Sequence, residues 1–240
     1  MDLKSVPVTY WLLGVIIAVF IAQVIVNVTF TPVIVATPFG TFGVGQVDWN
    51  FALWPTRVLH GDAVWGVLTS IFLHANILHI LFNGWALYLF GLSLEKLIGG
   101  KNLLKVFFAA GIVGSFAHIA FSIVVGSASL YALGASGAIF GVLGTFAVLR
   151  PNIRVIMMPV PIPLPLWQAV IMFVVFMSLI FGLGGLSGIA QDVHIAGLIV
   201  GVIMGLMFKK RIASDKDFTW RAVYAPVEKK DPYAWIDEYR

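Results

Sequence analysis

Residues 130–150 read LYALGASGAIFGVLGTFAVLR, an apolar stretch in which Ser136 lies between Gly134-Ala135 and Gly137. From Ser136 to Arg150 this segment is long enough to enter a bilayer but too short to cross ~30 Å of hydrocarbon at ~1.5 Å per residue. A helix that begins at Ser136 therefore begins below the membrane surface. Its unpaired N–H groups and the positive end of its dipole would point at the space around the serine. Such an arrangement suits a developing oxyanion.

The composition of the chain indicates a membrane protein. Its 240 residues are 60% hydrophobic and only 11% charged, and the mean hydropathy is +0.98. Apolar runs of about 20 residues recur, which predicts an all-α polytopic membrane protein. The chain has no cysteine, so disulfides, thiolate catalysis and cysteine-ligated zinc are excluded. Because the cations flank apolar spans, the net charge of +4 does not indicate a nucleic-acid partner.

The apolar runs predict a bundle of six transmembrane helices. The predicted spans are residues 9–29, 76–94, 103–125, 135–149, 166–184 and 191–208. Residues 30–75 form a first loop rich in glycine and tryptophan, which we expect to fold at the membrane interface. Residues 209–240 form a mixed-charge tail to which the sequence assigns no function. The first run is too long for the core of a signal peptide, so we expect a retained helix.

Lysine and arginine fall on one side of this arrangement. The opposite side has Arg57 as its only lysine or arginine. By the positive-inside rule, both termini are therefore cytoplasmic. The cations on the cytoplasmic side are Lys4, Lys96, Lys101, Lys105, Arg150, Arg154, Lys209, Lys210 and Arg211.

Polar residues of three spans fall at one depth. Ser136 precedes Arg150 by 14 residues, so it lies ~21 Å above the inner boundary. His194 precedes Lys209 by 15 residues, which gives ~22 Å. In the second span, His79 and Asn83 precede Glu95 by 16 and 12 residues, or ~24 and ~18 Å. All four lie in one layer near the outer surface, where polar groups must pair or line a watery cavity.

Glycine stripes explain how the fourth and sixth spans could meet. The sixth span has Gly197, Gly201 and Gly205 at intervals of four, and the fourth has Gly137, Gly141 and Gly144. Small residues at this spacing let membrane helices pack closely. This packing would bring Ser136 close to His194.

Each polar residue also has a structural interpretation. Ser136 could be only a helix N-cap. We expect Asp192 to cap the sixth helix, because it precedes His194 by two residues and should face another direction. The catalytic unit would then be a dyad without an orienting carboxylate. We interpret His118 as a solitary structural histidine, and Glu95 as a packing or hydrogen-bonding residue at the inner boundary.

Other hydrolytic chemistries lack their residues. No HExxH motif occurs, and His74 and His79 are five apart, so they should not share a helix face. No two carboxylates lie within the spans, as a paired-aspartate mechanism requires. We therefore expect no metal and no cofactor.

Three motifs together resemble the rhomboid intramembrane serine proteases across all six spans. They are HANILHILFNGWALYLFGLSLEKLIG at 74–99, GASGAIFG at 134–141 and HIAGLIVG at 194–201. The resemblance implies that Ser136 is the nucleophile and His194 the general base. It also implies an oxyanion hole formed by His79, Asn83 and the Ser136 N–H.

The resemblance extends to the surroundings of these residues. Phe140 stands where the family has an aromatic ring that packs on the catalytic histidine. Gly134 and Gly137 would let a substrate backbone approach. The family's first-loop Trp-Arg pair is Trp65-Gly66 here, so we expect the anchoring contacts of this loop to differ. The implied partners are single-span membrane proteins, with membrane lipids around the enzyme.

Two other functions remain open from the sequence. A non-catalytic rhomboid-like protein that binds membrane helices should lack the serine or the histidine, and this chain has both. A proton-coupled transporter would have polar residues through the full membrane depth. The minimal six-span form indicates the cell membrane of a prokaryote. The natural substrate and the oligomeric state do not follow from the sequence.

Overall fold

The computed structural model describes residues 6–37, 40–126, 131–157, 160–182 and 191–214. Across these residues the chain is mostly helical, as predicted. The first helix is α1 (Val8–Thr29), and a loop region with β1 (Val33–Thr37) and β2 (Gly40–Val44) follows it. This region continues through α2 (Gln46–Phe51), α3 (Pro55–Leu59), α4 (Gly66–Thr69) and the short 3₁₀ turn η2 (Ser70–Phe72).

The second half of the chain is built from longer helices and a second hairpin. These elements are α5 (Ile77–Ala86), the π-helical turn η3 (Leu87–Gly91), α6 (Leu92–Ile98), α7 (Gly100–Val124), α8 (Ser136–Leu149), β3 (Arg154–Met157), β4 (Val160–Pro165), α9 (Leu166–Gly182) and α10 (Gln191–Ser214). Because α10 continues to Ser214, it is longer than the predicted span 191–208. The predicted end of the fifth span and the tail from residue 215 lie outside the described residues.

Among the described residues, four continuous helical stretches are long and apolar enough to cross a membrane. They are Val8–Thr29, Ile77–Ile98, Gly100–Val124 and Gln191–Arg211, and α8 and the described part of α9 are shorter apolar helices. The chain is therefore a multi-pass integral membrane protein. Six spans with both termini in the cytoplasm remain a prediction.

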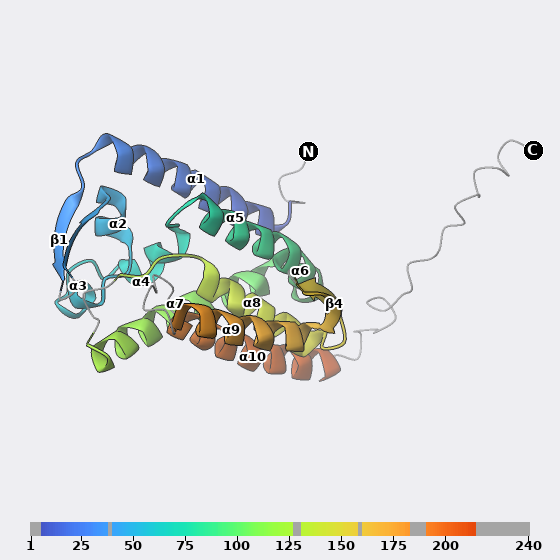
Figure 1. The fold of residues 1–240 in the computed structure, drawn as a ribbon. Coiled ribbons are helices and arrows are strands. Elements are labelled where there is room, and N and C mark those ends of the chain that lie inside the picture. Colours follow the sequence, from blue (N-terminus) through green and yellow to red (C-terminus); the bar gives the residue numbers. More distant parts are fainter. Residues whose placement is uncertain (1–5, 38–39, 127–130, 158–159, 183–190, 215–240) are drawn as a thin grey trace, which may run out of the picture.

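Helix α8 forms the centre of the bundle (Figure 1). Its eleven residues from Gly137 to Ala147 are all buried, which is expected of a helix that is apolar on every side. Helices α7 and α10 pack against it, together with α9 and the π-helical turn of the second span. A short helix is thus surrounded by longer ones, and its first residue is Ser136.

Glu95 joins the start of α1 to the end of the second span. Its carboxylate accepts hydrogen bonds from the N–H groups of Val8 at 2.7 Å and Thr9 at 2.9 Å, and from the Thr9 hydroxyl at 2.7 Å. A carboxylate at a helix N-terminus satisfies free N–H groups and complements the dipole. The hydrogen-bonding role predicted for Glu95 is confirmed.

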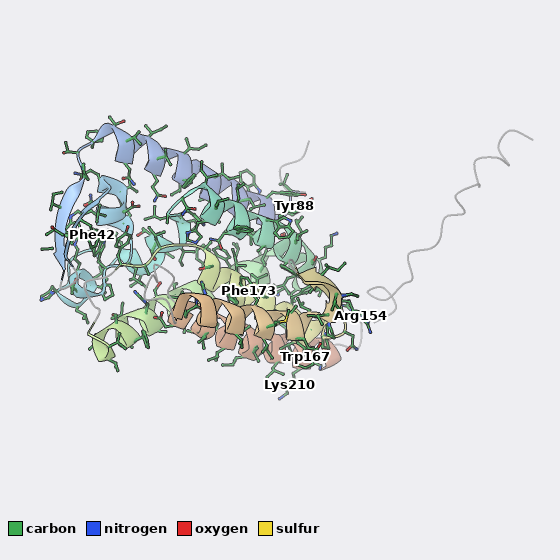
Figure 2. The ribbon with its side chains drawn as sticks, viewed as in Figure 1. Phe42, Tyr88, Arg154, Trp167, Phe173 and Lys210 are labelled. Carbon is green, nitrogen blue, oxygen red and sulfur yellow. The ribbon has the colours of Figure 1, made fainter. Side chains whose placement is uncertain are left out.

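Two of the cations assigned to the cytoplasmic side lie toward the same end of the bundle. Figure 2 shows Arg154 and Lys210 at the end opposite Phe42, which belongs to the first hairpin. The described part of the first loop, to which Phe42 belongs, therefore lies at the end of the bundle away from Arg154 and Lys210.

The first loop has a small core of its own. Val44, Ala52, Trp54 and Leu73 are buried together, and Tyr131 and Leu133 pack against them. Strands β1 and β2 form an antiparallel hairpin with Val33 opposite Val44. Because Tyr131 and Leu133 immediately precede Ser136, this core is a support for the start of α8.

Candidate active site

Close packing of α8 and α10 sets the geometry of the site. A Cβ atom on Gly197 would collide with the carbonyl oxygen of Gly137, and one on Gly201 would collide with that of Gly141. The Thr145 hydroxyl donates to the carbonyl oxygen of Gly201 at 2.9 Å. Backbone approaches this close require glycine. The packing predicted from the two glycine stripes is confirmed.

This packing brings the side chains of Ser136 and His194 together. The distance between Ser136 Oγ and His194 Nε2 is 2.7 Å. His194 is buried, and its other ring nitrogen, Nδ1, has no hydrogen-bond partner among the described residues. Ser136 is partly exposed at the start of α8. A serine that is accessible and bonded to a shielded imidazole has the geometry of a nucleophile and its base.

Phe140 lies one helical turn after Ser136 and fixes the plane of the histidine. Its ring stacks on that of His194 with centroids 4.7 Å apart and an interplanar angle of 26°. On its other side it stacks on Phe173 of α9 at 5.8 Å, and Figure 2 shows Phe173 over the middle of the bundle. The aromatic contact expected for Phe140 is present.

The N-terminus of α5 directs His79 toward the serine. Asn76 caps this helix, because its side-chain oxygen accepts from the N–H of His79 at 2.9 Å. The N–H of Ala75 donates to His79 Nδ1 at 3.4 Å. When Nδ1 accepts, the neutral ring carries its proton on Nε2.

Gly134 leaves the space that the His79 ring fills. Its φ of +128° favours glycine, and a Cβ there would lie 2.8 Å from His79 Cε1 and Nε2 and 3.8 Å from Ser136 Oγ. His79 Nε2 therefore lies on the serine side of α5.

Asn83 lies one helical turn after His79 and is buried. Its side-chain nitrogen has no hydrogen-bond partner in the part of the chain that the structure describes. A buried donor without a partner is costly and calls for an explanation.

Gly137 has a packing role that the sequence did not separate from the one predicted. A Cβ on this residue would collide with Val193 of α10, and its carbonyl oxygen contacts Gly197. Gly137 therefore makes room for α10, and Gly134 for the His79 ring. Approach of a substrate backbone to these two glycines stays a prediction.

The predictions for His118 and Asp192 are wrong. Each was made from the spacing of residues within one helix and did not consider contacts between α7 and α10. His118 is not solitary, since its Nδ1 lies 2.9 Å from Asp192 Oδ2. Asp192 does not precede the helix as a cap but lies inside the first turn of α10. Its carboxylate faces α7, as the predicted divergence from His194 requires.

His74 and His79 also meet, although they do not share a helix face. His74 precedes α5 and follows the extended residue Leu73, and the two ring centroids lie 5.0 Å apart. Burial lowers the pKa of His74 to about 4, with a further contribution from the charge of His79 when that ring is protonated. His74 is therefore neutral at pH 7. Within the described ranges, no group of three or more His, Cys, Asp or Glu could hold a metal ion.

Anchoring of the first loop uses contacts that the sequence did not reveal. A Cβ on Gly66 would lie 2.6 Å from the carbonyl oxygen of Ala52, so no side chain fits there. The neighbouring Trp65 donates its indole N–H to the carbonyl of Asn50 at 2.7 Å. Arg57 instead lies over the Trp49 ring, 4.4 Å from its centroid, and bonds the Trp49 carbonyl.

Arg57 also forms an ion pair at the surface of the first loop. Its Nε lies 2.7 Å from Asp62 Oδ2. This hydrogen bond lowers the pKa of the exposed Asp62 carboxyl.

The fold and this site together define a helical membrane protein with a Ser–His pair at the start of a buried central helix. Comparison with known proteins assigns its family. The family model for the Rhomboid domain matches residues 61–211. The chain belongs to the rhomboid family.

Several curated proteins are similar to this chain. Rhomboid protein 1, mitochondrial, of Saccharomyces cerevisiae is 30% identical over 185 residues, covering 73% of this chain and 52% of that protein. Rhomboid protease GluP of Bacillus subtilis is 36% identical over 138 residues, which cover 57% and 24%. Rhomboid-like protease 2 of Toxoplasma gondii is 28% identical over 213 residues, which cover 85% and 65%. The matches thus span between a quarter and two thirds of these relatives.

Proposed function

We propose that this chain is an intramembrane serine endopeptidase that uses Ser136 and His194 as a catalytic dyad. The observation that carries the proposal is the 2.7 Å hydrogen bond between Ser136 Oγ and His194 Nε2. Membership of a family whose relatives include named proteases supports the same reaction class.

The dyad would work through an acyl-enzyme. Ser136 Oγ attacks the scissile carbonyl carbon while His194 Nε2 takes the hydroxyl proton. His194 then gives this proton to the leaving amine as the C–N bond breaks. A water molecule then attacks the ester carbonyl carbon while the same nitrogen takes its proton, and this proton returns to Ser136 Oγ as the acyl C–O bond breaks and the carboxylic acid leaves. Phe140, stacked on the face of the imidazole, would fix the orientation of this ring during both proton transfers, a role that a carboxylate bonded to Nδ1 has in a triad.

The oxyanion would be stabilised from α5 and from the start of α8. His79 Nε2–H, the Asn83 amide nitrogen and the Ser136 N–H are the proposed donors. Support comes from the acceptor role of His79 Nδ1 and from the Asn83 nitrogen, which has no partner among the residues described. The free N–H groups and dipole of α8 would add to this field.

The proposed substrates are single-span membrane proteins whose helix unwinds near its outer end. A stable helix hides its carbonyl groups in hydrogen bonds, so residues that weaken the helix should expose the scissile bond. We further propose six spans within residues 1–208, with α8 and α9 as the two short ones. Both termini would face the cytoplasm, and the host membrane would be the cell membrane of a prokaryote.

The test is proteolysis in liposomes that contain the purified chain and a tagged single-span substrate. Wild type should cut the substrate and Ser136→Ala should not, and sequencing the new terminus places the cut relative to the membrane. Equal cleavage by both proteins would refute the role of Ser136. Binding of the substrate without cleavage by wild type would instead favour a non-catalytic helix-binding protein.

A further inference from the structure

We propose that Asp48 is a positioning residue for the oxyanion side of the site, acting through Gln23, Asn27 and the backbone of His74. We call these four residues the Asp48 clamp. The inference rests on the proposed function, because it concerns the orientation of His79 toward Ser136. The clamp joins α1, the first loop and the start of α5.

The first part of the clamp attaches α2 to α1. Asp48 accepts from Gln23 Nε2 at 2.6 Å and from Asn27 Nδ2 at 3.0 Å, one bond to each carboxylate oxygen. The Asn27 oxygen in turn accepts from the N–H of Val47 at 2.9 Å. A Cβ on Gly45 would collide with the Asn27 carboxamide. The backbone at the start of α2 is thus shaped around this side chain.

The second part attaches Gln23 to the chain before α5. Gln23 Nε2 also donates to the His74 carbonyl at 3.0 Å, and its oxygen accepts from the His74 N–H at 3.0 Å. One buried amide therefore satisfies both backbone groups of His74. The His74 ring packs edge-on against His79, with centroids 5.0 Å apart. A displacement of Gln23 would therefore move His74, and with it the His79 ring that lies beside Gly134.

A separate set of contacts links α2 to the chain before Ser136. The Asp48 carbonyl accepts from the indole N–H of Trp54 at 3.0 Å. Trp54 stacks on Tyr131 at 4.5 Å, and Leu53 and Ala132 exchange two backbone hydrogen bonds of 2.9 and 3.0 Å. Displacement of α2 would therefore disturb both partners of the site, His79 and the segment leading to Ser136.

The choice of an acid at residue 48 follows from its two donors. Gln23 and Asn27 both present amide N–H groups, and a carboxylate accepts on both oxygens whereas an asparagine accepts on one. Burial raises the pKa of the Asp48 carboxyl above its usual value, so an ionised group here costs free energy. The two hydrogen bonds, one to each carboxylate oxygen, require an acid at residue 48 despite the free-energy cost of burying its charge.

The chain offers a variant that reverses the polarity of one bond and keeps the rest. In the Asn27→Asp/Asp48→Asn double variant, the new amide at position 48 would donate to the new carboxylate at position 27. The amide oxygen would still accept from Gln23, and the carboxylate would still accept from the Val47 N–H. In the Asp48→Asn single variant, the new NH2 group would face the NH2 group of Gln23 or Asn27, so one of the two hydrogen bonds would be lost. Gln46→Ala is the matched control, because Gln46 lies on α2 but bonds the Thr31 carbonyl at 2.9 Å, away from His74.

The experiment measures kcat and KM on a tagged single-span substrate in liposomes, per mole of Ser136 labelled by a fluorophosphonate. Asp48→Asn should lower kcat about tenfold with KM nearly unchanged, since small misplacements of catalytic groups cost this much or more. The double variant should recover most of kcat, and Gln46→Ala should match wild type. Gln23→Ala, which cuts the link to His74 and leaves the Asn27 bond, should also lower kcat.

The outcomes separate this inference from the proposed function. If wild type neither cleaves nor labels, the proposed function fails and the clamp falls with it. If wild type cleaves and Asp48→Asn has the same kcat per labelled site, the clamp is only structural and the inference is wrong. A double variant no better than Asp48→Asn would also overturn it. If Asp48→Asn does not fold, a normal kcat in Gln23→Ala is the overturning result.

Discussion

The ring of Phe140 lies almost parallel to the imidazole of His194, with centroids 4.7 Å apart and an interplanar angle of 26°. This contact restricts rotation of the imidazole, whose Nδ1 has no hydrogen-bond partner across the described parts of the chain. Stacking of Phe140 on the face of the ring and the hydrogen bond of the Ser136 hydroxyl to Nε2 at its edge together determine the position of the proposed base.

Removal of the Phe140 ring should therefore slow turnover. Phe140→Leu keeps apolar volume but loses the flat surface, and we expect kcat to fall about tenfold because the base is less well oriented. Phe140→Tyr keeps the ring and should retain most activity. Liposome assays of both variants check this. Equal rates for Leu and Phe at residue 140 would show that stacking does not orient His194.

Asn83 should contribute to turnover more than to folding. Asn83→Ala removes one proposed oxyanion donor, a loss that typically costs ~2.7–4 kcal/mol of transition-state stabilisation at most. Because the side-chain nitrogen of Asn83 bonds nothing among the described residues, the apparent Tm should change little. Asn102→Ala is the control, since Asn102 bonds the Ile98 carbonyl at the other end of the bundle. A normal kcat in Asn83→Ala would remove Asn83 from the proposed oxyanion hole.

The His118–Asp192 contact should stabilise the first turn of α10. Asp192→Ala leaves a partly buried histidine without its hydrogen-bond partner, a loss that for a buried group typically costs ~1–3 kcal/mol. Asp192→Asn keeps an acceptor for His118 Nδ1 and should cost less. Apparent Tm in detergent micelles distinguishes the two. If the Ala and Asn variants are equally stable, the hydrogen bond of 2.9 Å contributes nothing measurable.

Acidification should destabilise the fold through His74. Burial holds the pKa of His74 at about 4 in the folded protein, whereas the unfolded chain has an ordinary histidine pKa of ~6.5. Between these values the unfolded chain binds more protons, so the free energy of unfolding falls as the pH drops. His74→Phe keeps a ring against His79 and removes this titration.

The two proteins should therefore diverge in acid. At pH 5 wild type should have lost roughly 2 kcal/mol relative to its stability at pH 8, beyond what His74→Phe loses. Apparent Tm measured across this range checks the sign. A parallel decline in both proteins would show that His74 does not carry the acid sensitivity.

The sequence predicted the parts of the site that depend on helix geometry alone. Depth follows from rise per residue, and close packing follows from glycine spacing. Ser136 and His194 could therefore be matched from their positions in the chain, although 58 residues separate them. The same argument placed Glu95 at the inner boundary, but its hydrogen bonds to Val8 and Thr9 at the start of α1 were not predicted.

Contacts made by irregular chain could not be predicted in this way. The His74 ring reaches His79 because the chain before α5 is extended, and no periodicity describes that conformation. The hairpins β1–β2 and β3–β4 alternate poorly and contain proline or glycine, which weaken a strand signal. The Asp48 clamp depends on how the first loop folds back on α1. His118 and Asp192 meet through the rotation of two helices, which spacing within one helix does not determine.

The most direct test of the central claim is covalent labelling by a fluorophosphonate. It shows which residue is modified and whether the modification requires His194. Wild type and His194→Ala would be treated with a fluorophosphonate in micelles, and the modified peptide located by mass spectrometry. The account predicts one adduct, on Ser136, that forms in wild type and is nearly lost in His194→Ala. An adduct elsewhere, or equal labelling of Ser136 without His194, would contradict it.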